Sequence, residues 1–184
     1  MKFKFSFIVF MTLLASCTEN YSPKPLGHHR IDFSEKEYQL FDSKCSYQFL
    51  RPKDAVVIEG NQQCWYLINY PTHNASLYLT YKKLNSDLAN IIEESHKLAY
   101  DHAIRSDGII EKVYANEAQK VFGVLYDIHG NSASNLQFFL TDSTNHFLRG
   151  ALYFNETPNA DSLLPVKEYI KEDFITLMES LTWS

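Results

Sequence analysis

The stretch that decides the fold is QKVFGVLYDIHGNSASNLQFFLTDSTNHFLRGALYFN, residues 119–155. Apolar and aromatic runs alternate in it with short turn-forming segments, a pattern typical of consecutive β-strands. The predicted strands span residues 119–128, 134–142 and 146–155. The predicted turns are Gly130-Asn131 and Ser143-Thr144-Asn145. Because strands so close in the chain pair with one another, the stretch predicts an antiparallel meander.

Two glycines, Gly123 and Gly150, lie inside these predicted strands. Glycine weakens a strand interior, so its presence there indicates a bulge or the close approach of a neighbouring group. We expect one or the other at both positions.

The rest of the chain adds strands and two helices around the meander. Further runs with strand character span residues 46–50, 64–70, 76–82 and 109–115. The last of these is expected to join the meander as its first strand, through a turn at Asn116-Glu117. An amphipathic segment capped by Asn85 or Ser86 and ended by Gly108 predicts one helix, and a segment starting at Asp161 or Ser162 predicts another. This order indicates an α+β fold, a single antiparallel β-sheet of about six to seven strands with two main helices packed on it.

The N-terminus has the three parts of an export signal. Lys2 and Lys4 form a basic region, residues 5–14 form an apolar region, and Leu14-Ala15-Ser16-Cys17 resembles the lipobox of bacterial lipoproteins. We predict cleavage before Cys17 and lipid attachment to its thiol, which holds a protein on a bilayer without a membrane-spanning helix. The alternative is an ordinary signal peptide that happens to end at a cysteine.

The predicted organisation therefore has three parts. Residues 1–16 form the signal peptide, residues 17–43 the lipid-anchored cysteine with an extended tether, and residues 44–184 a single domain. The tether is predicted from its prolines and glycine, which favour extended chain over helix or strand. No stretch after Cys17 is apolar enough to span a bilayer.

Charge limits the partners of the mature chain. Cleavage removes Lys2 and Lys4, so 15 basic residues face 22 acidic ones and the net charge becomes −7. Such a balance disfavours nucleic acid and electrostatic binding to anionic lipid. Membrane attachment is thus expected through the lipid on Cys17, and no cofactor is expected.

Two cysteines remain after Cys17, namely Cys45 and Cys64. An exported protein lies in a compartment where disulfides persist, and a bridge here would stabilise the fold by about 3 kcal/mol. A simple hairpin of the strands that carry them would instead place Cys45 near Asn69. The sequence leaves open whether the two are bridged or are small buried thiols.

The sequence carries few signs of catalysis or metal binding. Phosphate-loop, dinucleotide-binding, nucleophile-elbow and zinc-protease motifs are all missing from it. His28 and His29 are adjacent in extended chain, and His96 and His102 are separated by about 240° around a helix, so neither pair suits one ion. We expect no metal site.

One short segment holds the residue types of a hydrolase triad, since Asp142, Ser143 and His146 lie close together. Residues so close in a turn rarely reach triad geometry, and the alternative is a turn capped by the Asp and Ser side chains. Nearby, Arg149 shares a strand face with Phe147 and is expected either to pair with a carboxylate or to serve in recognition.

The chain resembles the gliding-motility lipoproteins of the GldD family along the whole mature sequence. The early motifs are Tyr21-x-Pro23-Lys24-Pro25-x-Gly27, Arg30-Ile31, Cys45-x-Tyr47-x-Phe49 and Cys64-Trp65. The denser late motifs are Gly130-Asn131-x-Ala133-Ser134, residues 137–143, residues 146–154, Pro158-Asn159-x-Asp161-Ser162 and Pro165-Val166.

This resemblance implies a cell-envelope lipoprotein of Bacteroidota-type bacteria that is required for gliding. It implies a non-catalytic structural or assembly component associated with the type IX secretion and gliding machinery, whose proteins would be its partners. The resemblance points to residues 130–163 as a functional surface or as core. The residues expected on an interaction surface are Asp142, Ser143, His146, Arg149, Asn159 and Asp161.

The alternative function is an envelope enzyme or ligand-binding lipoprotein acting on peptidoglycan, glycan or lipid. An uncharacterised hydrolase would use Asp142, Ser143, His146 and Arg149, and a ligand carrier would need an apolar cavity beneath the sheet. Residues 18–20 lack an acidic cluster of the kind expected for surface export, so the body is expected to face the periplasm.

Overall fold

The computed structural model describes residues 33–101, 106–157 and 159–184. The predicted signal peptide, Cys17 and most of the predicted tether lie outside this range, as does His102.

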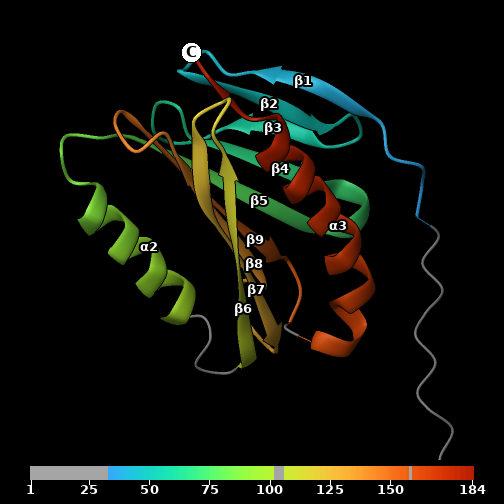
Figure 1. Ribbon diagram of the computed structural model, residues 1–184. Helices are drawn as coiled ribbons and strands as arrows, with labels where there is room; N and C mark the ends of the chain where they lie inside the picture. The colour runs from blue at the N-terminus through green and yellow to red at the C-terminus, as the bar shows by residue number, and fades with distance from the viewer. Residues whose placement is uncertain (1–32, 102–105, 158) are drawn as a thin grey trace, which may run out of the picture.

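A seven-stranded antiparallel sheet forms the centre of the molecule (Figure 1). In spatial order it contains β3 (Val56–Glu59), β4 (Tyr66–Tyr70), β5 (Ala75–Lys83), β9 (His146–Phe154), β8 (Leu136–Thr141), β7 (Val121–Gly130) and β6 (Ser106–Asn116). A 3₁₀ turn, η1 (Pro71–His73), connects β4 to β5. The four strands of residues 106–154, β6 to β9, pair in sequence order and form the predicted meander.

Two helices and a smaller sheet cover the central sheet. Helix α3 (Ala160–Ser180) and a three-stranded sheet lie over one face, and α2 (Leu88–Asp101) lies over part of the other (Figure 1). The smaller sheet has the order β1 (Tyr38–Asp42), β2 (Tyr47–Pro52), β10 (Thr182–Trp183). The α+β class is therefore confirmed, with a second small sheet in addition to the single one predicted.

Strand alternation divides the apolar residues between two cores. On β9, Leu148 and Leu152 point into the larger core beneath α3 and the small sheet, whereas Phe147 points into the smaller core beneath α2. On the neighbouring β8, Phe138 and Phe139 divide in the same way. This is the period of two expected of a strand buried on both faces.

The predicted boundary at residue 44 is too late, because β1 lies inside the predicted tether. Phe41 packs its ring 5.2 Å from that of Phe49 across the β1–β2 pair. Just before β1, the ammonium of Lys36 lies 2.7 Å from the buried carboxylate of Asp173 on α3, which also accepts a 2.8 Å hydrogen bond from the Tyr38 hydroxyl. These contacts hold residues 36–41 against the folded body.

The predicted helix ends are also wrong in detail. The first backbone hydrogen bond of α2 runs from Ile91 N to Asp87 O, so Asp87 takes the position predicted for Asn85 or Ser86. Gly108 does not end α2 but lies in β6 beside a register shift, where its φ of +152° suits glycine.

For α3, the cap is Asn159 and not Asp161 or Ser162. The Asn159 backbone is extended and its side-chain oxygen accepts a 3.2 Å hydrogen bond from Ser162 N, which is the usual geometry of an N-cap.

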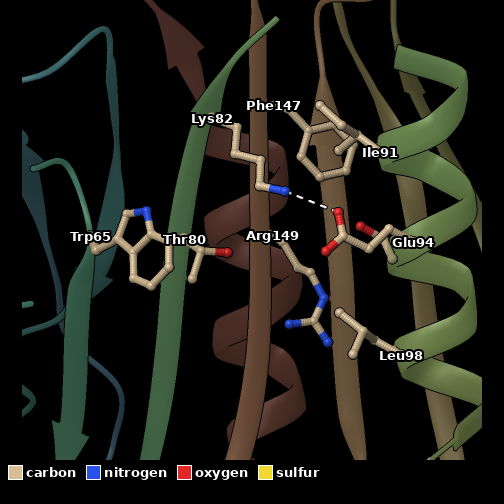
Figure 2. Close-up of a pocket in the computed structure, with 9 residues that line it drawn as sticks. Trp65, Thr80, Lys82, Ile91, Glu94, Leu98, Phe147 and Arg149 are labelled. Carbon is tan, nitrogen blue, oxygen red and sulfur yellow. Dashed lines mark hydrogen bonds and ion pairs between the residues drawn. The ribbon is translucent and has the colours of Figure 1, made fainter. Parts of the chain in front are cut away.

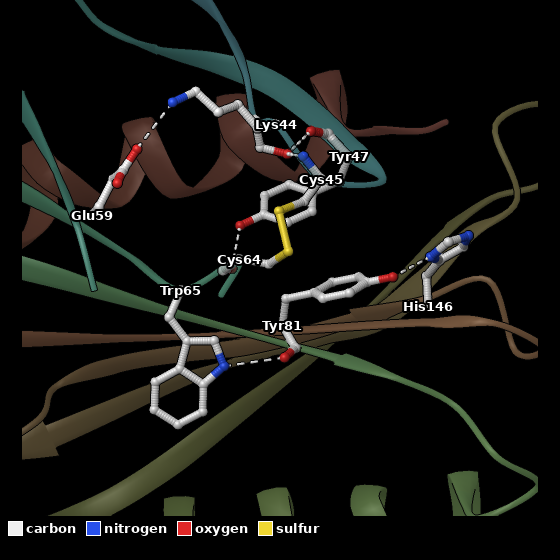
Figure 3. The surroundings of a disulfide bond; sticks show 9 residues. Lys44, Cys45, Tyr47, Glu59, Cys64, Trp65, Tyr81 and His146 are labelled. Carbon is white, nitrogen blue, oxygen red and sulfur yellow. Dashed lines mark hydrogen bonds and ion pairs between the residues drawn. A yellow bond between two sulfur atoms is a disulfide. The ribbon is translucent and has the colours of Figure 1, made fainter. Parts of the chain in front are cut away.

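A disulfide joins Cys45 and Cys64, with the two Cα atoms 5.8 Å apart. The strands do not form the simple hairpin that would have placed Cys45 near Asn69, because β2 and β4 belong to different sheets. The bridge therefore links the small sheet to the loop that enters β4. Beside it, the Tyr47 hydroxyl donates a 2.9 Å hydrogen bond to the Cys64 carbonyl (Figure 3).

The close packing predicted at the two strand glycines is present. A Cβ on Gly150 would lie 2.2 Å from the Phe138 ring, and a Cβ on Gly123 would lie 1.9 Å from the Phe139 carbonyl oxygen. The space left by Gly150 is filled by Phe138, whose ring meets Phe174 of α3 edge-on at 5.5 Å. Gly150 thus leaves the space in which Phe138 packs against α3.

We predict that Gly150→Ala lowers the free energy of unfolding by about 1–3 kcal/mol, because the added methyl overlaps a fully buried ring. Urea denaturation measures the change. The double variant Gly150→Ala with Phe138→Leu should lose less free energy of unfolding than the sum of the losses in the two single variants. Additive losses would show that the ring and the glycine do not interact.

We predict that replacing Cys45 and Cys64 together by alanine lowers the free energy of unfolding by about 3 kcal/mol, since the bridge closes a loop in the unfolded chain. Denaturation with and without reductant measures this. The wild type in reductant should match the double variant. A wild type whose midpoint does not respond to reductant would contradict the prediction.

Candidate functional site

The predicted triad residues form a capped turn between β8 and β9. One carboxylate oxygen of Asp142 accepts hydrogen bonds from the backbone amides of Thr144, Asn145 and His146, at 3.0, 2.8 and 2.8 Å. Burial raises the pKa of Asp142, but these amides and the Thr144 hydroxyl outweigh it and lower the pKa to about 2. The carboxylate therefore stays ionised and holds the turn.

The imidazole of His146 is occupied by other partners. Its Nδ1 lies 2.7 Å from the Tyr81 hydroxyl, and its ring stacks on Trp183 with the centroids 5.2 Å apart. Ser143 adopts a left-handed backbone and donates its amide to the Thr141 hydroxyl. The three residues are thus close together but form a turn and not a triad. The Asp142 side chain caps this turn as expected, whereas the second cap is the Thr141 hydroxyl and not the Ser143 side chain.

Arg149 lies in the middle of β9, on the face that α2 partly covers (Figure 2). Its Nη2 donates a 2.5 Å hydrogen bond to the side-chain oxygen of Gln137 on β8. Burial lowers the pKa of the guanidinium, while nearby Tyr153 and Glu94 raise it. Arg149 forms no ion pair with any residue in the described ranges. The expected pairing with a carboxylate is therefore not found there.

A pocket of 240 Å³ opens beside Arg149, between α2 and the sheet (Figure 2). Across it, Lys82 of β5 and Glu94 of α2 form an ion pair of 3.0 Å. The complete lining is Trp65, Thr80, Lys82, Ile91, Glu94, Ser95, Leu98, Phe147 and Arg149. Arg149, one of the residues predicted for an interaction surface, therefore lines a cavity.

The six predicted surface residues do not form one patch. Asp142, Ser143 and His146 lie at the β8–β9 turn, whereas Asn159 and Asp161 lie at the start of α3. There the Asn131 side chain, from the β7–β8 connection at the other end of β8, accepts a 2.8 Å hydrogen bond from Ala160 N. Asn159 and Asp161 are thus tied to the opposite end of the strand from the capped turn.

Most of the pocket and a buried charge cluster were not predicted from the sequence. Lys82 and Glu94 carried a weak signal, as polar positions on a predicted strand and helix. Under α3, the carboxylate of Asp127 contacts Lys167 and lies 2.5 Å from the ammonium of Lys171. Their i, i+4 spacing on the helix could have suggested a shared partner, but no local pattern indicates Asp127 as that partner.

No helix in the described ranges is long and apolar enough to cross a membrane. The fold and the site define a small α+β protein. In it the residues of the suspected triad hold the β8–β9 turn, and Arg149 faces a pocket. A comparison with protein families matches residues 18–183 to the one described as gliding motility lipoprotein GldD. The chain belongs to this family, and is accordingly a membrane-anchored lipoprotein of the cell envelope. No curated protein matches it.

We predict that Asp142→Asn lowers the free energy of unfolding at pH 7 by about 1–2 kcal/mol, because the amides then face a neutral oxygen. The pKa of Asp142 is lower in the folded chain, at about 2, than its ordinary value of 3.8. Its contribution is therefore complete above pH 4 and is lost as the pH falls toward 2. Denaturation curves of both proteins should converge across this window. A difference independent of pH would contradict the prediction.

Proposed function

We propose that this chain is a non-catalytic structural or assembly component of the gliding and type IX secretion machinery. In this proposal residues 1–16 are removed, lipid on Cys17 holds the protein in the membrane, and the body faces the periplasm. The observation that carries the proposal is the family match over residues 18–183. The capped turn adds support, since the residue types of a hydrolase are engaged there in holding the fold.

An exposed apolar area supports a role in protein contact. Val56, Ile58 and Tyr78 are 49, 46 and 47% exposed, and the strand registers place all three on the face of the central sheet that bears α2. Helix α2 lies toward the β7–β9 side, where its contacts form the smaller core. Grouped apolar side chains on an otherwise polar surface are typical of a protein–protein interface. We propose this area as a contact with a protein of the machinery.

Deleting the gene is expected to abolish spreading on agar and to reduce export of the motility adhesins. The wild-type gene on a plasmid should restore both. Unchanged spreading and export in the deletion strain would refute the proposed function.

Cys17→Ala, exported behind a conventional signal peptide, is expected to give a folded periplasmic protein that fails to restore spreading. The physical reason is that the lipid supplies the membrane attachment, which the acidic body does not. Fractionation and thermal denaturation check release and folding. Full motility from this released protein would show that the anchor is dispensable.

Ile58→Asp is expected to reduce spreading without a large loss of stability, because a charge in a buried contact costs binding energy while the position is exposed in the free protein. The matched control is Val113→Asp, since Val113 is 83% exposed on β6, the opposite edge strand of the same sheet. Equal effects of the two variants would argue against a contact at Ile58.

A further inference from the structure

The pocket beside Arg149 has an uncompensated positive charge. Its lining holds two cations, Lys82 and Arg149, and one carboxylate, Glu94. Lys82 and Glu94 neutralise each other in their ion pair at the edge of the pocket, where both are about half exposed. Arg149 therefore supplies the net charge, in a chain whose overall balance is acidic.

The guanidinium is held in place by a neutral partner. Its hydrogen bond goes to the side-chain oxygen of Gln137, which is 1% exposed. The amide nitrogen of Gln137 is buried and has no hydrogen-bond partner among the described residues. A buried amide and a partly buried cation are thus fixed together without a carboxylate. Such an arrangement retains electrostatic affinity for an oxyanion, which a guanidinium binds through two parallel hydrogen bonds.

The remaining walls are apolar and aromatic. Ile91 and Leu98 come from α2, Phe147 comes from β9, and Trp65 lies just before β4 (Figure 2). The hydroxyls of Thr80 and Ser95 add two further polar groups. At 240 Å³ the pocket is somewhat smaller than typical sites for drug-sized ligands, which measure about 300–1,000 Å³. It has room for one ring or a short chain.

We propose that this pocket binds a small ligand in which one oxyanion group, a carboxylate or a phosphate, is joined to a single ring or short apolar chain. Arg149 takes the oxyanion, and Trp65, Phe147 and Leu98 contact the apolar part. The proposal goes beyond the proposed function and does not depend on it, because it concerns binding by the purified protein.

Trp65 provides the readout, since it lines the pocket and the only other tryptophan, Trp183, stacks on His146. The lipidated protein in nonionic detergent is titrated with N-acetylphenylalanine, with its neutral amide, and with phenyl phosphate. Fluorescence and titration calorimetry should show saturable binding of at least one anion at a single site. The amide should bind about tenfold more weakly or worse, because it lacks the charge. In Trp65→Phe the fluorescence change should disappear.

The two anions distinguish the source of the natural ligand. Binding of the carboxylate alone indicates an organic acid, and binding of phenyl phosphate alone indicates a phosphate ester. Either result supports the proposal. Saturable binding of the acid and its amide with equal affinity, or no binding of either anion, would overturn it.

Arg149→Gln should bind the acid no more tightly than the amide, whereas the control Lys112→Gln, which removes an exposed charge from β6, should behave as the wild type. Leu98→Phe leaves Arg149 in place and narrows the pocket. Because Leu98 is partly exposed, this variant should still fold, and its affinity for the anion should be lower. If neither Arg149→Gln nor Leu98→Phe changes the affinity, the anion binds elsewhere and the proposal fails.

Discussion

The pairing of β5 with β9 is the interaction on which the rest of the structure depends. It runs over nine residues on each strand, from Ala75 opposite Phe154 to Lys83 opposite His146. It joins the early strands β3–β5 to the late meander β6–β9, and so creates both the continuous surface that α3 covers and the floor of the pocket. Because its partners are about 60–80 residues apart in the chain, a long loop must close before the pairing contributes stability.

The parts of the fold that depend on interactions between residues close in the chain could be predicted from the sequence. The meander over residues 106–154 could be predicted because apolar alternation and turn residues act over a few positions. The close packing at Gly150 could be predicted because glycine weakens a strand unless a neighbouring group needs the space. The second sheet could not be predicted. Its strand β10 has two residues, and β2 looks like any other strand until Tyr47 and Trp183 are known to be opposite each other. That register depends on tertiary packing.

The same distinction explains the candidate site. The residue types of Asp142, Ser143 and His146 suggested a hydrolase triad. The backbone amides around Asp142 take their positions only in the folded turn, so the sequence does not indicate them. Arg149 was identified correctly as unusual, because a cation in the middle of an apolar strand requires a reason. Its surroundings come from β5, β8, α2 and Trp65, which lies just before β4. A single sequence therefore indicates the cation and not the pocket around it.

The contacts of Lys36 and Tyr38 with Asp173 have a mechanical consequence. They lie at the start of β1, which is an edge strand paired only with β2 in the small sheet. An edge strand by itself peels away under tension one hydrogen bond at a time. The ionic contact instead passes the pull to α3, whose Phe174 and Leu177 are embedded in the larger core. A pull applied on the N-terminal side of these contacts is thus passed through α3 to the core of the protein before it reaches the rest of β1.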